Sequence, residues 1–159
     1  MPAASSQIEV VRSLFLEYAE SLGFSLCFQN FDRELAELPG AYAPPRGRLL
    51  IGLVDGAPAG CVALRPMPDG ACELKRLFVR PAFRASGLGR GLMDRILAEA
   101  RGMGYTVMRL DTVAGKMDRA IAMYRKLGFT EIPAYGEHPV EGTIWMEMEL
   151  ANPGAGPRG

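Results

Sequence analysis

The hydrophobic pattern of the chain changes its period at Pro81, and this change restricts the fold to a mixed class. Before Pro81 lie three apolar segments of strand length, 48–54, 59–66 and 71–79. The turn sequences DGAP and MPDG separate them, which is typical of an antiparallel meander. After Pro81, apolar residues recur at helical spacing: Leu88, Leu92, Ile96 and Ala100. The pattern therefore predicts strands followed by a helix.

The remaining segments extend this mixed pattern in both directions. Helical spacing predicts a helix over 7–22, a short helix over 31–38 and a third stripe over 117–127. Further strands are expected at 24–28, 106–112, 129–132 and 143–150. Together these elements predict an α/β (α+β) fold with a mixed, mostly antiparallel central sheet of about seven strands flanked by helices.

Composition restricts the domain organisation and the kinds of partner. The 159 residues are 48% hydrophobic, which predicts one domain over 1–150 and a flexible tail over 151–159. Basic and acidic residues both total 18, so no net field favours nucleic acid or an anionic membrane. No apolar run approaches the ~20 residues of a membrane span. The first residues lack a signal-peptide pattern, so we expect a cytoplasmic protein.

The cysteines give no indication of a metal site. Cys27, Cys61 and Cys72 are odd in number, lack metal-ligand spacing and lie in apolar stretches. We expect buried free thiols and no metal.

A glycine-rich turn, RASGLGRGL at 84–92, joins the predicted third strand to the following helix. Such a turn presents unpaired N–H groups at the positive end of a helix dipole, which favours phosphate. A P-loop is excluded because Gly89 is followed by Arg90 and Gly91 instead of Lys and Ser or Thr. A dinucleotide fingerprint is disfavoured because Leu92 stands where its third glycine belongs. The glycines could also serve only helix–strand packing.

The remaining phosphate motif is RxxGxG, and here the chain resembles the GNAT superfamily of acetyl-CoA-dependent N-acyltransferases. LFVRPAFRASGLGRGLMDRIL (77–97) is similar to the central motif of that family, and AIAMYRKLGF (120–129) to its second motif. The resemblance covers about 48–150, with ELKRLFV, LDT and GTIWMEMEL similar to small bacterial members. Ala85 and Ser86 depart from the usual glycine and basic residue, and Met117 from a common asparagine.

The resemblance implies a GNAT-like acyl-CoA N-acyltransferase fold and an N-acetyltransferase activity. An acetyl group would move from acetyl-CoA to a primary amine of a small molecule or peptide, directly in a ternary complex. The pantetheine arm would lie along the strand before the turn, and the pyrophosphate on the turn. The implied cofactor-binding residues are Leu77, Phe78, Val79, Arg84, Ala85, Ser86, Gly87, Leu88, Gly89 and Arg90.

The resemblance also suggests catalytic residues, each with a plainer alternative. Tyr124 would donate a proton to the CoA sulfur or hold it, but it also fits an ordinary core tyrosine. Glu73 would act as general base, or else pair with Lys75 or Arg76. Its facing is open, because ELKRLFV alternates poorly and a β-bulge would change which side chains reach the cleft. Tyr135 and His138, in the loop 134–142, would border the acceptor site, although an exposed loop histidine is equally ordinary.

Two other functions remain as alternatives. A non-catalytic acyl-CoA-binding or sensing domain would keep the turn, and a nucleotide-binding oxidoreductase is disfavoured by the missing third glycine. Neither nucleic acid nor a membrane is an expected partner. Members of the family often dimerise, so a homodimer stays open.

Overall fold

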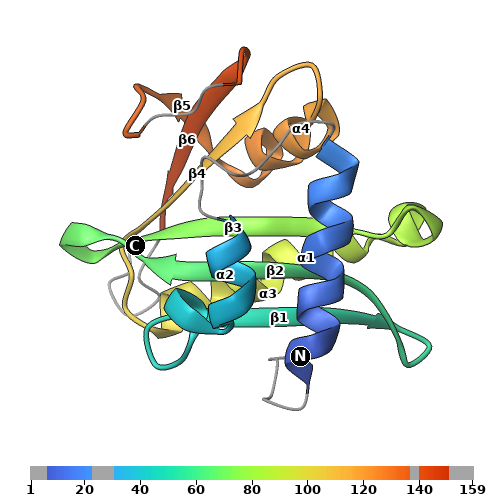
Figure 1. Ribbon diagram of the computed structural model, residues 1–159. Coiled ribbons are helices and arrows are strands. Elements are labelled where there is room, and N and C mark those ends of the chain that lie inside the picture. Colours follow the sequence, from blue (N-terminus) through green and yellow to red (C-terminus); the bar gives the residue numbers. More distant parts are fainter. Residues whose placement is uncertain (1–6, 23–30, 137–139, 151–159) are drawn as a thin grey trace.

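The computed structural model describes residues 7–22, 31–136 and 140–150. Two helices, α1 (Ile8–Leu22) and α2 (Phe31–Glu37), precede the sheet. The strands are β1 (Arg48–Val54), β2 (Ala57–Pro66), β3 (Ala71–Val79), β4 (Val107–Val113), β5 (Thr130–Ile132) and β6 (Thr143–Glu149). Helix α3 (Leu88–Gly102) connects β3 to β4, and α4 (Asp118–Leu127) connects β4 to β5 (Figure 1).

The sheet is mixed and mostly antiparallel, as predicted. Its six strands follow the order β1-β2-β3-β4-β6-β5, and only the β3–β4 pair is parallel. The sequence predicted about seven strands. The additional one, at 24–28, lies outside the described residues, as do Cys27 and the tail at 151–159.

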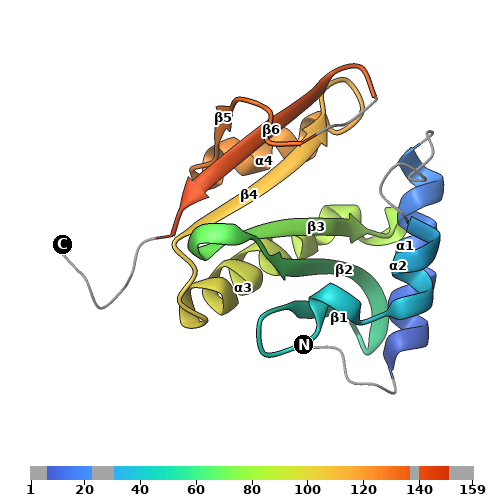
Figure 2. The same ribbon diagram turned by 60° about the vertical axis from the view of Figure 1, so that its left-hand side comes forward.

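β3 and β4 pair over a short length only and then separate. The paired residues are Ala71 with Val107, Cys72 with Met108 and Glu73 with Arg109. Beyond Glu73 the two strands diverge, and β4 rises away from β3 together with β6 (Figure 2). The opposite edge of β3 stays paired with β2 as far as Val79. The sheet therefore consists of two halves that are joined at one end and open at the other.

Each face of the sheet buries its own hydrophobic cluster. The stripe predicted on α3 packs Leu92, Met93 and Ile96 against β2, β3 and β4, with α4 on the same side. The other face packs Val11, Leu14 and Phe15 of α1 against β1, β2 and β3. Each such side chain contributes ~1.5–3 kcal/mol when fully buried. Cys61 and Cys72 are buried free thiols, one in each cluster, as predicted.

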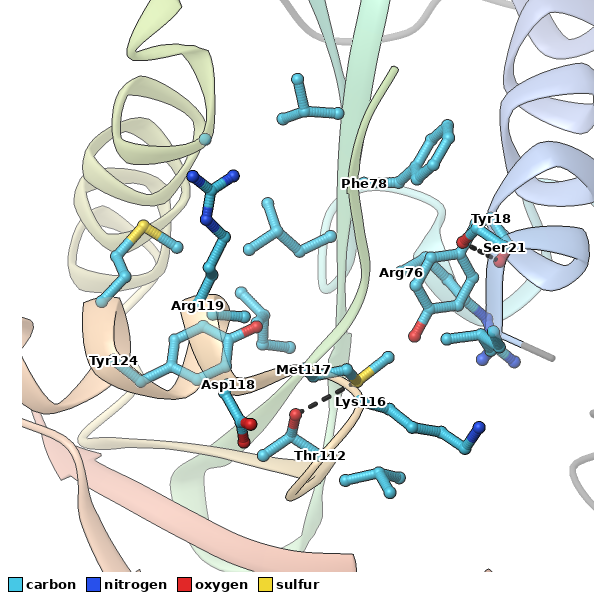
Figure 3. Close-up of a pocket in the computed structure, with 18 of the residues that line it drawn as sticks. Tyr18, Ser21, Arg76, Phe78, Thr112, Lys116, Met117, Asp118, Arg119 and Tyr124 are labelled. Carbon is cyan, nitrogen blue, oxygen red and sulfur yellow. Dashed lines mark hydrogen bonds between the residues drawn. The ribbon is translucent and has the colours of Figure 1, made fainter. Parts of the chain in front are cut away.

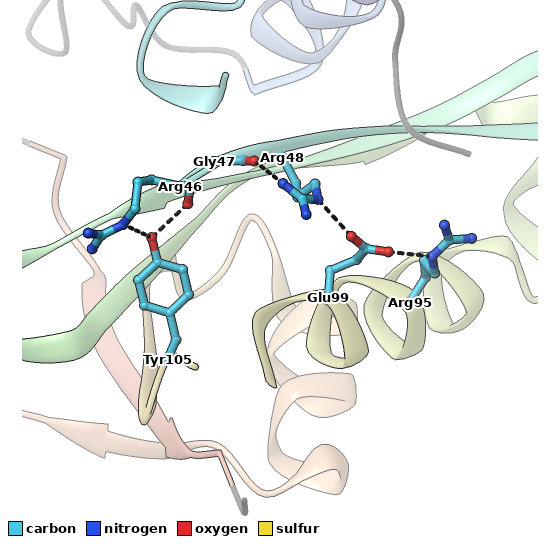
Figure 4. A network of polar contacts seen from close by, with 6 residues as sticks. All are labelled: Arg46, Gly47, Arg48, Arg95, Glu99 and Tyr105. Atoms are coloured by element: carbon cyan, nitrogen blue, oxygen red, sulfur yellow. Dashed lines mark hydrogen bonds and ion pairs between the residues drawn. The ribbon is translucent and has the colours of Figure 1, made fainter. Parts of the chain in front are cut away.

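A polar network fastens the last turns of α3 to β1 (Figure 4). The Glu99 carboxylate accepts hydrogen bonds from Arg48 at 2.7 Å and Arg95 at 3.0 Å, and these bonds lower the pKa of Glu99. Just beyond the helix, the Tyr105 hydroxyl donates to the Arg46 carbonyl at 2.6 Å. These contacts fix the far end of the helix whose beginning carries the glycine turn.

None of the helices within the described ranges has the length and apolar character needed to cross a bilayer. The same part of the chain holds no group of three or more His, Cys, Asp or Glu side chains that could bind a metal ion.

Candidate active site

A cleft of about 660 Å³ opens where β3 and β4 separate. Its walls come from α1, β3, the start of α3, β4 and the start of α4 (Figure 3). Because the strands have parted, the cleft passes through the sheet. Side chains from both hydrophobic clusters therefore reach it, Tyr124 from one and Phe78 from the other.

The glycine turn forms one end of the cleft. It begins as a 3₁₀ helix, η5 (Pro81–Ser86), and passes into α3 through Gly87, whose φ of 82° and ψ of 6° are left-handed. That conformation explains why a glycine is needed there. The Ser86 hydroxyl donates to the Phe83 carbonyl at 2.5 Å and accepts from the Leu88 N–H at 3.3 Å. Ser86 thus caps the turn locally.

Seven of the ten predicted cofactor-binding residues line the cleft: Leu77, Phe78, Val79, Arg84, Gly87, Gly89 and Arg90. Ala85, Ser86 and Leu88 are not among the lining residues. Ser86 is engaged in its local cap, and the Leu88 side chain is directed towards β1 and β2. Arg84 donates from Nε to the Val79 carbonyl at 3.0 Å, which holds its guanidinium at the end of β3.

Packing within the protein does not explain the other two glycines of the turn. A Cβ atom at Gly89 would lie 3.7 Å from Cγ2 of Val79, an ordinary contact, and one at Gly91 would meet nothing within 4 Å. Neither residue has a positive φ. Helix–strand packing therefore requires neither glycine, whereas close approach of a ligand to the helix start would require the cleft-lining Gly89.

Two basic residues that the sequence analysis did not select line the opposite wall. Lys116 and Arg119 come from the loop after β4 and the first turn of α4, and Figure 3 shows Arg119 extending from α4 into the cleft. Together with Arg84 and Arg90 they give this cleft a basic lining. The signal that could have found them is their position beside Met117, at the beginning of the second motif.

Tyr124 lines the cleft and is also part of the core. It is 5% exposed, and its ring lies 5.6 Å from that of Phe129. Burial raises the pKa of its hydroxyl, and the nearby Tyr18 and Asp111 raise it further. The hydroxyl therefore keeps its proton well above neutral pH. Tyr124 is therefore a core residue, as one interpretation predicted, and its place in the cleft lining leaves its predicted role toward the CoA sulfur as a prediction.

A β-bulge in β3 resolves the facing of this strand. The register with β2 shifts between Cys61 and Ala63, and Arg76 adopts a left-handed φ of 61°. Before the bulge Lys75 is opposite Ala63, and after it Phe78 joins the α1 cluster while Leu77 packs against the α3 cluster. The bulge explains the poor alternation of ELKRLFV.

Arg76 itself is buried beneath α2. Its guanidinium donates to both carboxylate oxygens of Glu34, at 2.9 and 2.8 Å, and lies over the rings of Phe31 and Tyr18. Its side chain is only 2% exposed. Arg76 is therefore not the partner of Glu73.

Glu73 is held away from the cleft by a different partner. Its Oε1 accepts from Arg65 of β2 at 2.8 and 2.7 Å, and its Oε2 accepts from the Tyr135 hydroxyl at 2.8 Å. Burial by itself would raise the pKa of Glu73, but the charges of Lys75 and Arg65 and the two hydrogen-bonded partners lower it below its usual value. Glu73 is not among the cleft-lining residues, whereas Lys75 is.

The structure brings together Tyr135, predicted to border the acceptor site, and Glu73, the candidate base, but joins them to each other and not to the cleft. The Tyr135 ring packs at 6.5 Å against Trp145. His138 lies outside the described residues. Two carboxylates do line the cleft: Asp111 on β4, which is half-buried, and Asp118 at the start of α4, which is exposed and accepts a hydrogen bond from the Gly115 N–H. The family resemblance selected Glu73, and the acidic residue within the apolar segment LDT is the sequence signal that could have found Asp111.

Known proteins resemble this chain in sequence and in fold. The model of the acetyltransferase (GNAT) family matches residues 10–129. An uncharacterized N-acetyltransferase of Schizosaccharomyces pombe is 36% identical over 142 residues, which cover 88% of this chain and 86% of that protein. An IAA acetyltransferase of Azospirillum brasilense is 36% identical over 110 residues, covering 68% and 71%.

In fold, the chain is similar to a GNAT-family acetyltransferase of Staphylococcus aureus, with a TM-score of 0.79, 17% identity and coverage of 95% and 98%. The family match spans α1 through α4 and so includes the parted strands, the glycine turn and Tyr124. The chain belongs to the GNAT family of acetyltransferases and is an acyltransferase.

Proposed function

We propose that the protein transfers the acetyl group of acetyl-CoA directly to a primary amine while both substrates are bound. The observation that carries this proposal is the open edge of β3 beside the glycine turn. From Leu74 to Val79 this edge has no strand partner on the β4 side, so its backbone can pair with an extended amide-containing arm as if with another strand. Pantetheine is such an arm, and we expect it to extend along the open edge of β3 to the glycine turn.

The phosphate end of the donor fits the chemistry of the turn. Backbone N–H groups at the start of α3 favour an anion, and Gly89 lets the anion approach closely. Arg84, Arg90 and Arg119 line the same end of the cleft and supply charge-assisted hydrogen bonds. The serine at position 86 replaces a basic residue of related proteins, and Arg119 supplies compensating charge from across the cleft.

Tyr124 acts on the sulfur side of the reaction. In the transfer the amine nitrogen bonds to the acetyl carbon, the carbon–sulfur bond breaks, and the amine loses one proton. A free thiol has a pKa of about 8.5, far below the raised pKa of Tyr124, so full proton transfer from this tyrosine is unfavourable. Tyr124 instead donates a hydrogen bond to the departing sulfur, while the backbone N–H near Leu77 polarises the thioester carbonyl.

The amine proton requires an acceptor on the opposite wall. Glu73 remains a candidate base, but Arg65 and Tyr135 already occupy both its oxygens and lower its pKa, which weakens it as a base. Asp111 lines the cleft and is the second candidate. We expect Asp111→Asn to lower kcat by about 10²-fold, the usual contribution of a positioned base, and Glu73→Gln to lower it less.

The kind of acceptor is inferred from the family and not from the residues of the cleft. The Schizosaccharomyces pombe relative is named an N-acetyltransferase, which specifies a nitrogen acceptor. We propose an amine of a small molecule or a peptide, modified in the cytoplasm. Two of the three acidic residues of α2 do not indicate a cationic acceptor, because Glu34 pairs with Arg76 and Glu37 with Arg33.

Calorimetric titration with acetyl-CoA, followed by CoA release across a panel of amines, tests this function. We expect saturable binding and amine-dependent release of the free thiol. Failure to bind at millimolar acetyl-CoA would overturn the proposal. Binding without release for any amine would favour the sensing domain instead. Tyr124→Phe serves as the matched variant, since it should bind acetyl-CoA as the wild type does but turn over slowly.

A further inference from the structure

The Leu88 side chain occupies a recess formed by two glycines on neighbouring strands. Leu88 is the first residue of α3, directly after Gly87. Gly52 of β1 and Gly60 of β2 are register partners. A Cβ atom at Gly52 would lie 2.7 Å from Cδ1 of Leu88, and one at Gly60 would lie 3.3 Å from Cδ2. A side chain at either position would intrude on the space that Leu88 fills, so both positions require glycine. We call this recess the Gly52–Gly60 socket.

The β1–β2 register shifts between Gly52 and Leu53, but this irregularity does not place Gly52 at a backbone conformation that requires a glycine. A glycine within a strand weakens it, and a positive φ would justify one, but Gly52 is not among the residues with positive φ. The three atoms nearest to its hypothetical Cβ all belong to Leu88. Gly60 is constrained twice, because its Cβ would also lie 2.5 Å from the Phe78 carbonyl oxygen. Gly52 is therefore the more specific probe of the socket.

The segment just before Leu88, η5 and Gly87, has few contacts with the interior of the protein. No residue of η5 is buried, and Gly87 is exposed. Arg84 and Ser86 hydrogen-bond to the Val79 carbonyl and within the turn itself, and the Arg84 guanidinium also lies over the Phe78 ring. Leu88 lies between Gly87 and Gly89, both of which line the cleft. With a rise of 1.5 Å per helical residue, any displacement of Leu88 moves the N–H groups on either side of it.

We propose that Leu88, seated in the Gly52–Gly60 socket, is a positioning residue that sets the affinity of the turn for the acyl donor. This inference rests on the proposed function, in which the turn holds the phosphates of acetyl-CoA. Hydrogen bonds weaken steeply once distance and angle depart from their optimum, so a turn moved outward by a methyl group would bind phosphate poorly. The chemistry at Tyr124 and Asp111 lies on other elements and would be unchanged once the donor is bound.

Gly52→Ala should raise the KM for acetyl-CoA by about tenfold, as expected for overpacking a close contact, and leave kcat within about twofold. Gly91→Ala is the matched control: it adds the same methyl group to α3, the helix that Leu88 begins, at a place where nothing lies within 4 Å, and it should leave both constants unchanged. Shortening the opposing side chain should rescue the variant. We expect the Gly52→Ala/Leu88→Val pair to bind acetyl-CoA more tightly than either single variant.

Amide hydrogen exchange of residues 87–90 in the free protein tests the socket separately from the proposed function. Gly52→Ala should accelerate it by about threefold or more, and the Leu88→Val rescue should slow it again, whether or not acetyl-CoA binds. If wild type fails to bind acetyl-CoA but exchange responds as described, the proposed function fails and the socket stands. Unchanged exchange and KM in Gly52→Ala, or no rescue in the pair, would overturn the socket. Should Gly52→Ala not fold, Leu88→Val alone must raise KM without lowering kcat.

Discussion

The two halves of the sheet differ in how completely they are closed. β1, β2 and β3 pair along most of their lengths and are covered by α1 on one face and α3 on the other. β4, β5 and β6 form a second unit, whose strand pairing with the first is limited, in the described part of the chain, to three residue pairs at the start of β3. The first half therefore provides rigidity and the glycine turn. The second half provides Asp111 and α4, and the opening between the halves provides the cleft.

The largest effect should come from breaking the closed half. Glu34→Ala removes the carboxylate that pairs with Arg76, whose side chain is 2% exposed. Loss of one member of a buried pair costs about 3–5 kcal/mol. Urea unfolding should show this loss, and Glu37→Ala, on the same helix but in an exposed pair, is the control. If Glu34→Ala lowers the free energy of unfolding by less than about 1 kcal/mol, the first half does not depend on the contact between α2 and Arg76.

The second prediction separates chemistry from stability at the opening. Tyr124→Phe keeps the ring beside Phe129 and removes only the hydroxyl. We expect kcat to fall by about 10²-fold while acetyl-CoA affinity and the melting temperature change little. Steady-state kinetics with calorimetry checks both quantities. An unchanged kcat would leave Tyr124 as a core residue only.

The third prediction concerns the end where the halves meet. Glu73 receives Tyr135 from beyond β5 and Arg65 from β2, so it links the two halves. Glu73→Gln should lower stability at pH 7 by ~1–3 kcal/mol through loss of charge-assisted hydrogen bonds. Since the folded-state pKa of Glu73 is lowered, its contribution is present above the ordinary carboxyl pKa of ~4.3 and is lost as pH falls through the lower folded value.

Thermal unfolding of wild type and Glu73→Gln between pH 7 and pH 3 measures that contribution. The two melting temperatures should converge only on the acid side. Tyr135→Phe removes one of the hydrogen bonds and should give a smaller gap of the same pH dependence. A gap that is constant down to pH 3 would show that the carboxylate charge plays no part in joining the halves.

The smallest effect is expected at the exposed rim of the turn. Arg90 pairs with Asp94 one helical turn away, and both side chains are more than half exposed. Asp94→Asn should change stability by only ~0.3–0.5 kcal/mol. It also releases Arg90 for the donor phosphates, so acetyl-CoA affinity should rise by about twofold at low salt and lose that gain at high salt. Calorimetry at two ionic strengths checks this, and weaker binding at low salt would contradict it.

Sequence periodicity predicted most of the fold because the faces of the strands and helices are set by burial. The stripe of α3 and the alternation of β6 follow directly from apolar spacing, and β1 and β3 have the predicted bounds. The parting of β3 from β4 could not be predicted in this way. It is a property of how two strands far apart in the chain meet, and no local pattern records where their pairing stops.

The sequence was most informative about the candidate site where a motif determines the local backbone. It was least informative where a side chain contacts residues that are distant in the sequence. Gly87 and Arg84 lie where the motif places them, because the turn is a local structure. Glu73 could be selected as an acidic residue in an apolar strand, but its partner Arg65 lies across on β2 and Tyr135 beyond β5. The bulge at Arg76 decides which residues face which cluster, and it was weighed from the sequence without being located.

The open edge of β3 has a consequence for how such a protein can change through evolution. In the proposed function the donor pairs with main-chain atoms at the open edge of β3 and with the start of α3, and main-chain atoms are the same whatever the side chains are. Substitutions can therefore accumulate on the strands and on α1 while the grip on the donor persists. The cleft is also lined by side chains such as Tyr18, Lys75 and Asp111, and each replacement there would alter which amine fits. One ancestral donor site can in this way serve many descendants that differ only in the amine they modify.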